Sequence, residues 1–365
     1  MDKNENILLC STKNTNKYKD SRIYYLDYLR IFCSFFVIVI HVSTKYYRRF
    51  KLKSYNWKIS HYYDSLSRFS VPNFFMISGA VFLNRDISYK KIFNKYIKNI
   101  FIHLVLWILI YSLYNINSFS IFNIKNKLLY IIRGNHHLWY LFTTIGIYII
   151  VPFLREIVKN EKILKYFIVL YFVSSFIIPN YLYLLSYYSK DISVLIRYLF
   201  SAINFNGVPI QIYYFTIGHY LNQKKTTKNI RIVIYITGFI GLIFTTKITY
   251  DIAMIKNKKI NHYSAFYFNI FFTSITIFIF FKNNCNNLRF NKKYKKIILN
   301  ISQLTYGIYL MHPLIIVILI QKLHFFYLPI NAIYLIPMLT SFIFLLSLFV
   351  SMLLKKLPLL CKYLV

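Results

Sequence analysis

The chain has 365 residues, of which 57% are hydrophobic and 20% aromatic, and its 45 Lys and Arg against 10 Asp and Glu give a formal charge of +35. Soluble proteins average about 45–50% apolar and about 25% charged residues. Here only 15% of the residues are charged, and the mean hydropathy is +0.47. So little polar surface cannot cover a water-soluble core, which excludes an ordinary soluble enzyme.

Uncharged intervals, mostly of bilayer-spanning length, alternate with basic clusters along the sequence. A helix that rises about 1.5 Å per residue needs about 20 residues to cross roughly 30 Å of hydrocarbon. We therefore predict an all-α polytopic membrane protein, a bundle of about ten transmembrane helices, with residues 1–22 as a polar cytoplasmic tail and 23–365 as a single transmembrane domain. Ten intervals lack Asp, Glu, Lys and Arg: 31–44, 69–84, 99–124, 134–154, 166–189, 198–223, 232–246, 260–281, 297–321 and 323–354.

The high positive charge does not predict a nucleic-acid partner. The basic residues stand in short clusters between apolar runs rather than along one binding face, and an excess of Lys, Asn, Ile, Tyr and Phe is typical of A+T-rich coding. The four cysteines show neither CxxC nor metal-ligand spacing. We therefore expect no bound metal, no bound cofactor and no disulfide scaffold.

The distribution of basic residues predicts the orientation in the cell membrane. With the amino terminus inside, the segments assigned to the cytoplasm hold 27 Lys and Arg in 91 positions, and the opposite loops hold 17 in about 100 positions. A plasma-membrane protein with both termini in the cytoplasm follows. The exception is segment 45–68, predicted to be an external loop, which carries seven basic residues. Either it tolerates this charge or it meets something anionic outside.

The first span carries ionisable residues, which are costly in hydrocarbon and mark functional sites. Arg30 and His41 are eleven residues apart, so they share one helical face about 16 Å apart along the axis. Asp27 falls on the same face near the cytoplasmic end. A cation at the cytoplasmic end of the span and an imidazole deeper in the membrane suit a donor that has phosphates at one end and a reactive group on a long arm. Coenzyme A thioesters have this shape. The alternative is an interfacial pair of Asp27 with Arg30 and a His41 that only bonds another helix.

The second predicted span begins with the stretch RFSVPNFFMISG, from Arg68 to Gly79. Pro72 frees a backbone carbonyl, and Ser78 with Gly79 permits close helix approach, so we expect a kinked and tightly packed helix. Ser78 is a candidate site residue, although ordinary small-residue packing also explains it.

Two later stretches add histidines. The fourth span opens with HHLWYL, in which Trp139 fits an interface belt of aromatic residues and His137 is unusual. In the ninth span Tyr309 and His312 share a face at i, i+3, and His312 lies at a depth similar to that of His41. Two intramembrane histidines at matching depth indicate a shared site. His103 and His219 have no motif around them, and we interpret them as core residues.

Together these stretches resemble the acyltransferase-3 family of integral-membrane acyltransferases, and most closely its surface-polysaccharide O-acyltransferase branch. Each motif alone is weak, but four in order over residues 24 to about 313 form a specific pattern. They are LDYLRIFCSFFVIVIH with its Arg, ten residues, then His; RFSVPNFFMISG; HLWYLFTTIGIYIIVPFLR; and YGIYLMHP. The resemblance implies a helical bundle that transfers an acyl group, usually acetyl from acetyl-coenzyme A, to a hydroxyl of a glycan or lipid-linked sugar.

Carried over by motif, the resemblance makes His41 the leading catalytic candidate and Arg30 the donor-end residue, with pocket candidates Arg68, Ser78, Trp139, Tyr309 and His312. Of these, His312 is the second predicted catalytic residue. Asp27 and His137, chosen by position, complete the predicted site. Two departures stand out. Asn73 replaces a small apolar residue, and KKIFNKYIKN offers lysines where an Arg-rich cluster is frequent, which affects phosphate contacts because Lys lacks the bidentate fork. The fused esterase-like domain of many members is not expected here.

The predicted chemistry is general-base catalysis by neutral His41, with a covalent acyl-imidazole route as an alternative. The sequence does not rank Tyr309, Trp139 and His312 as oxyanion donors. The expected partners are membrane lipids, the acyl-coenzyme A donor and a glycan or lipid-linked sugar acceptor. A glycan exporter or a non-catalytic membrane protein of the same architecture is the rival interpretation, although the spans hold few of the acidic coupling residues that transporters use.

Overall fold

The computed structural model describes residues 22–115, 136–202, 209–255, 257, 268–285, 291–322 and 330–357, and the regular elements within them are all helical, which confirms the all-α prediction. Of the predicted tail, residues 1–21 lie outside the described residues. In chain order the helices are α1 (Tyr24–Arg49), α2 (Tyr55–Ser67), α3 (Ser70–Phe82), α4 (Tyr89–Lys91), α5 (Lys98–Asn115), α7 (Trp139–Lys159), α8 (Glu161–Phe172), α9 (Ile178–Tyr188), α10 (Lys190–Ala202), α11 (Ile210–Gln223), α12 (Lys228–Ile255), α13 (Phe268–Cys285), α14 (Lys292–Val317) and α15 (Ala332–Lys356).

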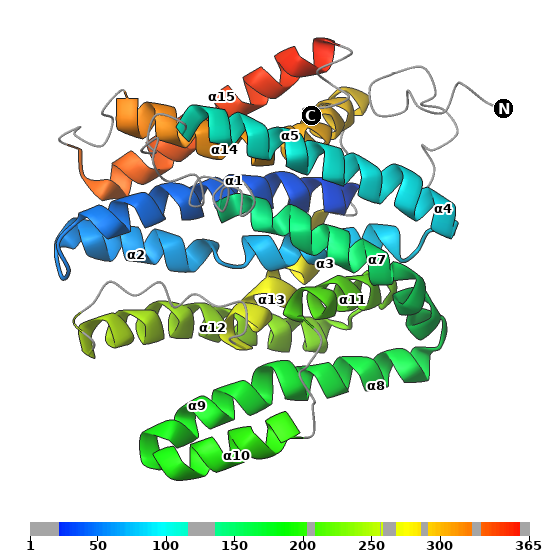
Figure 1. Ribbon diagram of the computed structural model, residues 1–365, viewed down its shortest axis with the longest axis vertical. Helices are drawn as coiled ribbons and strands as arrows, with labels where there is room; N and C mark the ends of the chain where they lie inside the picture. Colours follow the sequence, from blue (N-terminus) through cyan, green and yellow to red (C-terminus); the bar gives the residue numbers. More distant parts are fainter. Residues whose placement is uncertain are drawn as a thin grey trace, which may run out of the picture.

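Helix α1 is the centre of the arrangement. It packs against α14 and α15 on one side and against α2, α3 and α13 on the other, and most of the long helices run roughly parallel or antiparallel to it (Figure 1). Helices α8, α9 and α10 lie at one edge of the molecule, away from α1 (Figure 1). A site built on α1 is therefore surrounded by helices from both ends of the sequence.

Seven helical stretches among the described residues are long and apolar enough to cross a membrane, so the expected count of about ten is not confirmed. The uncharged intervals 69–84 and 198–223 fall partly in α3 and α11, which have 13 and 14 residues. Such helices rise about 20 Å, less than the hydrocarbon thickness. The seven are Tyr24–Arg49, Tyr89–Tyr114, His136–Lys159, Glu161–Leu182, Lys228–Ile255, Lys292–Ile320 and Ala332–Lys356.

Segment 45–68 is not the loop that was predicted. Its first residues complete α1, and α2 occupies Tyr55–Ser67, where Ser54 caps the helix by accepting a 3.2 Å hydrogen bond from the Trp57 N–H. Trp57 is fully buried. The prediction was wrong because hydropathy registers α2 as polar, whereas its polar side chains face neighbouring helices rather than water.

Close backbone contact joins α3 to α11, as the small residues of α3 predicted. A Cβ on Gly79 would overlap the backbone carbonyl of Phe215, and a Cβ on Gly218 would overlap the backbone of Met76. The two glycines thus let each helix lie against the other's main chain. Pro72 stands in the first turn of α3, where its missing N–H removes no helical hydrogen bond.

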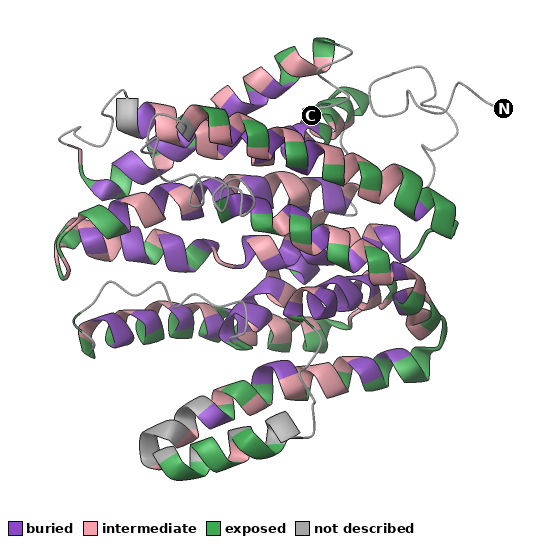
Figure 2. Ribbon diagram, in the orientation of Figure 1, coloured by how far each residue is buried: buried purple, intermediate pink, exposed green. Residues whose placement is uncertain are grey.

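Burial separates the interior of the bundle from its outer face. The buried positions concentrate on α1, α2, α3, α11 and α14, whereas α8 and α10 are largely exposed (Figure 2). Many exposed positions are large and apolar, which fits a surface that faces lipid rather than water. Examples are Phe153, Tyr166, Val169, Phe239 and Leu345.

Candidate active site

Two histidines meet in the interior although 271 residues separate them in sequence. His41 of α1 and His312 of α14 lie with their ring centroids 5.0 Å apart. His312 is fully buried and His41 is partly exposed. Their contact follows from the packing of α14 against α1, which brings two residues of similar predicted depth side by side.

The surroundings of His312 determine which ring nitrogen is available. Its Nδ1 lies 3.0 Å from the Ile308 carbonyl oxygen, and because a carbonyl only accepts, Nδ1 is the donor. Pro313 has no N–H for the Tyr309 carbonyl, and that oxygen also bonds the His312 ring. A neutral His312 therefore carries its lone pair on Nε2, which is buried and makes no hydrogen bond within the described part of the chain.

A third imidazole completes what we call the histidine cluster: His41, His137 and His312. His137 belongs to the 3₁₀ turn His136–Leu138 at the start of α7, and its ring centroid is 6.0 Å from that of His312. The Tyr309 hydroxyl donates a 2.6 Å hydrogen bond to the His137 carbonyl and fixes this turn against α14. The Nε2 of His137 is buried and makes no hydrogen bond to any described residue.

The histidine cluster is not arranged as a metal site. Among the described residues, no group of three His, Cys, Asp or Glu side chains is placed to hold a metal ion. The cluster therefore offers imidazole nitrogens as proton acceptors and hydrogen-bonding groups.

Phenol groups of α7 lie between Arg30 and the histidine cluster. Arg30 is partly exposed and within electrostatic range of the Tyr140 and Tyr148 hydroxyls. The Tyr140 hydroxyl also lies near Ser78 of α3, whose own hydroxyl donates to the Phe74 carbonyl, and the Tyr140 ring lies 5.5 Å from the Tyr309 ring. Electrostatic interaction thus connects Arg30 to Tyr148 and Tyr140, and ring contacts connect Tyr140 to Tyr309 and the histidines. We call this series of groups the polar wall.

Asp27 is already occupied by protein partners. Its two carboxylate oxygens pair with Arg22 at 2.8 and 2.9 Å, and one of them accepts a 2.6 Å hydrogen bond from the Ser302 hydroxyl of α14. The side chain is 4% exposed. In this structure Asp27 ties the start of α1 to α14 rather than opening to the wall that carries Arg30.

Arg68 stands at the break between α2 and α3. Its Nη2 donates to both carboxylate oxygens of Asp64, at 2.6 and 2.5 Å, one turn earlier in the chain. Arg68 also lies within electrostatic range of His41, as does Lys45. The Lys and Arg side chains that interact electrostatically with His41 therefore come from the end of α1 and from the α2–α3 junction.

A model of the acyltransferase-3 family, described as an acyltransferase domain, matches residues 23–356, nearly all of the chain. The chain belongs to this family. No curated protein and no solved structure matches it. Family membership and the apolar helices together identify a multi-pass membrane acyltransferase.

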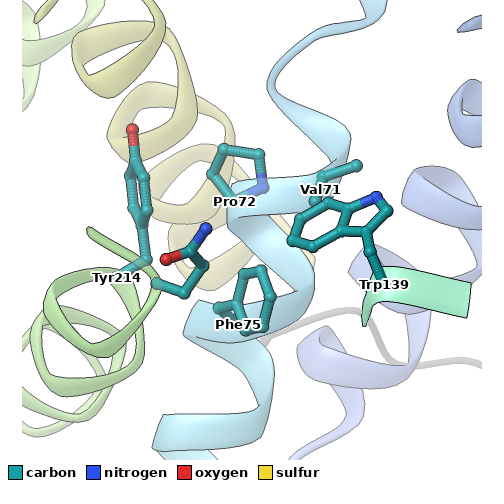
Figure 3. A pocket seen from close by; sticks show the side chains of 6 residues that line it. Val71, Pro72, Phe75, Trp139 and Tyr214 are labelled. Carbon is teal, nitrogen blue, oxygen red and sulfur yellow. The ribbon is translucent and has the colours of Figure 1, made fainter. Parts of the chain in front are cut away.

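Trp139 of this acyltransferase points into a small apolar pocket rather than onto the imidazole rings. The pocket lies where α3, α7 and α11 meet, and Trp139 faces Val71, Pro72 and Phe75 across it, with Tyr214 on the far side (Figure 3). Trp139 remains 39% exposed. The structure therefore brings together His41, His137, His312 and Tyr309, places Arg30 and Ser78 along the adjoining wall, and leaves Trp139 at its edge.

Sequence reasoning missed Tyr140, Tyr148 and Asp64. The first two stand in the fourth-span motif, but aromatic residues there are also typical of a membrane interface, so the sequence did not single them out. Asp64 could have been found from its spacing, because an Asp four residues before an Arg on a helix can form an ion pair with that Arg, as Asp64 does with Arg68. The prediction of a loop over 45–68 hid that pairing.

Proposed function

We propose that this membrane acyltransferase transfers an acetyl group from cytoplasmic acetyl-coenzyme A to a hydroxyl of a surface polysaccharide or lipid-linked sugar, as a member of the surface-polysaccharide O-acyltransferase branch. The observation that carries the proposal is the pairing of His41 with His312 at one end of a polar wall that begins at Arg30. The proposal places the protein in the plasma membrane with both termini in the cytoplasm.

The donor binds along the polar wall. Arg30 contacts the phosphates at the cytoplasmic end, and the arm of the coenzyme extends along α1 past Tyr148 and Tyr140, so that the thioester reaches His41 about 16 Å further in. Phenol hydroxyls suit the amide groups of such an arm, since each can donate or accept a hydrogen bond. Asp27 supports this end indirectly by fixing the start of α1 through Arg22 and Ser302.

The reaction needs one base and no cofactor. Neutral His41 takes the proton of the acceptor hydroxyl as its oxygen attacks the thioester carbonyl. The tetrahedral intermediate then breaks its C–S bond, and the imidazolium returns the proton to the leaving thiolate, which gives an acetyl ester and free coenzyme A. Proton transfer by a positioned side chain accounts for about 10²–10⁴-fold in rate.

The neighbours of His41 orient the reactants. The buried Nε2 lone pair of His312 accepts a hydrogen bond from the acceptor sugar, and Arg68 faces the negative charge that develops on the thioester oxygen. Tyr309 holds the turn that carries His137 in place. These roles explain why the ionisable groups of the interior gather at one point of α1.

The acceptor approaches from the opposite side of the membrane to the donor. The end of α1, the connection that follows it and the start of α2 together carry six basic residues. Lys45 is close enough to His41 to interact with it electrostatically. These cations attract an anionic acceptor, such as an acidic glycan or a lipid-linked pyrophosphate sugar. The six are Lys45, Arg48, Arg49, Lys51, Lys53 and Lys58.

Mass spectrometry of surface glycans tests the proposal in cells. Glycans from cells that make the native protein should carry an acetyl group that is absent when the gene is deleted or when His41 is replaced by Ala. The position of the lost acetyl group would name the acceptor sugar. Identical glycans in all three strains would contradict the proposed acceptor class.

A further inference from the structure

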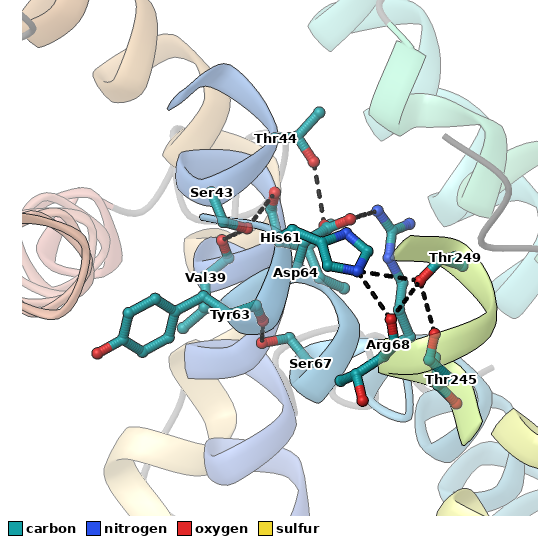
Figure 4. Close-up of polar contacts among 12 residues, drawn as sticks. Val39, Ser43, Thr44, His61, Tyr63, Asp64, Ser67, Arg68, Thr245 and Thr249 are labelled. Atoms are coloured by element: carbon teal, nitrogen blue, oxygen red, sulfur yellow. Dashed lines mark hydrogen bonds and ion pairs between the residues drawn. The ribbon is translucent and has the colours of Figure 1, made fainter. Parts of the chain in front are cut away.

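The ion pair at the α2–α3 junction has an unusual position for a carboxylate. Asp64 is 1% exposed and lies deep among helices of a membrane protein, where a lone charge is costly. Its partner is Arg68, whose Nη2 donates to both of its oxygens (Figure 4). The pair is local, i to i+4 on one turn, so it is not needed to join distant parts of the chain.

A second contact ties Asp64 to the helix that carries His41. The Thr44 hydroxyl of α1 donates a 3.1 Å hydrogen bond to Asp64 Oδ1 (Figure 4). Thr44 is three residues after His41, so both stand on the same face of α1. Asp64 therefore receives hydrogen bonds from the His41 face of α1 and from the guanidinium that lies in electrostatic range of His41.

Helix α2 is also fixed against α12. His61, one turn before Asp64, bonds the Thr246 carbonyl of α12 at 3.0 Å and contacts the Thr249 hydroxyl at 3.2 Å (Figure 4). Held between α1 and α12, the carboxylate has a set position. An arginine side chain has about 2 kcal/mol of rotamer entropy, and a fixed carboxylate is what confines it to one place.

We propose that Asp64 is a positioning residue, which holds the Arg68 guanidinium within electrostatic range of His41 while Thr44 fixes the carboxylate to α1. This inference rests on the proposed function, in which Arg68 stabilises the developing oxyanion. Asp64 itself does not touch the substrate. Its contribution is to have the cation in place before the charge forms, so that no reorganisation is needed at the moment of reaction.

Charge substitutions separate positioning from stability. The assay follows transfer of radiolabelled acetyl from acetyl-coenzyme A to the glycan and glycolipid fraction of the host membranes, with native protein and His41→Ala side by side. Asp64→Asn should lower kcat about 10- to 100-fold with little change in donor KM, because loss of an oxyanion donor costs about 10²–10³-fold. In an Arg68→Gln background, the same change should alter kcat by no more than about two-fold.

A reversed pair provides the stringent control. The double variant Asp64→Arg with Arg68→Asp restores an ion pair at the same two positions, so a merely structural pair would recover activity. Positioning predicts a protein that melts near the native temperature but stays inactive, since the cation has moved away from His41. Glu156→Gln, which breaks the exposed i, i+3 pair with Lys159, should leave kcat unchanged.

Chemical labelling reads the position of Arg68 without any turnover. Phenylglyoxal reacts with accessible guanidinium groups, and peptide mass spectrometry gives the labelling rate of Arg68 relative to Arg231 of α12. Asp64→Asn and Thr44→Val should each increase this rate several-fold. This labelling tests the position of Arg68 even if neither the native protein nor His41→Ala transfers acetyl. An absence of acetyl transfer in both would contradict the proposed function, not the position of Arg68.

Three kinetic outcomes would overturn the inference: native kcat in Asp64→Asn, multiplicative losses in the Asp64→Asn, Arg68→Gln double variant, or an active reversed pair. If Asp64→Asn does not fold, the reversed pair and Thr44→Val still decide. An Arg68 labelling rate that is unaffected by Thr44→Val would also contradict it.

Discussion

The contact between α3 and α11 makes Gly79 a sharp test of how the fold supports the site. Gly79 directly follows Ser78, which lies near the Tyr140 hydroxyl, and α3 begins two residues after Arg68. In Gly79→Ala the new methyl group would overlap the backbone carbonyl of Phe215. Because main-chain atoms cannot rotate aside as a side chain can, α3 and α11 must move apart.

The cost can be isolated with a matched glycine. Gly146 lies in α7 and is exposed, and a methyl group added there would meet no neighbouring atom within 4 Å, so Gly146→Ala changes only helix propensity. That gain, up to about 1 kcal/mol, is common to both variants and cancels in their difference. Overpacking typically costs about 1–3 kcal/mol. We expect Gly79→Ala to be less stable than Gly146→Ala by about 3 kcal/mol, the upper end, because the clash is with backbone.

The assay is the free energy of unfolding of both variants from a denaturant titration in one detergent, together with acetyl transfer. A misplacement of about 1 Å at reacting groups can cost about 10²-fold in rate, so Gly79→Ala should also lose at least about ten-fold in kcat while Gly146→Ala keeps the native rate. Equal stability of the two variants would refute the close packing, and native activity in a destabilised Gly79→Ala would refute its link to the site.

Three further substitutions test the site. Arg30→Ala should raise the donor KM by about 10- to 100-fold, the loss expected for charged hydrogen bonds, and an unchanged KM in steady-state kinetics would exclude the donor contact. Tyr309→Phe leaves the His137 carbonyl without its 2.6 Å donor and should lower kcat about ten-fold at native donor KM, measured in the same kinetics. His312→Gln should reduce kcat by about 10²-fold while donor binding, followed by calorimetry with coenzyme A, stays native.

Some features of the site could be read from the sequence because a helix has a fixed rise. The eleven-residue spacing sets the distance between Arg30 and His41 on any continuous helix, and α1 is continuous from Tyr24 to Arg49. In the same way, the number of residues between the end of the ninth span and His312 predicted that His312 lies at the depth of His41. The two rings are in contact. Depth along a membrane helix depends only on local geometry.

Contacts between helices could not be read in the same way. Asp27 was expected to face the donor with Arg30, but it bonds Ser302, 275 residues away in the sequence. No single-helix periodicity reports which neighbour packs against a given face. The same reason explains why α2 was missed, since Asp64 and His61 read as solvent-exposed until α1 and α12 are placed around them.

The count of membrane spans shows another limit of hydropathy. Uncharged stretches predict where charge is avoided, but they do not distinguish a full span from a short helix that is buried among others. Helix α11 is uncharged because Tyr213, Tyr214 and Phe215 are packed against other helices, not because it is long enough to cross the bilayer.

The proposed function depends above all on His41 as the base of an acyl transfer. Its most direct test is the single-turnover rate of acetyl transfer from radiolabelled acetyl-coenzyme A by purified native protein and by His41→Ala, with the melting temperature of each measured in the same detergent. If His41 is the base, the variant should melt like the native protein and lose at least about 10²-fold in rate. A well-folded His41→Ala protein that transfers acetyl at the native rate would contradict it.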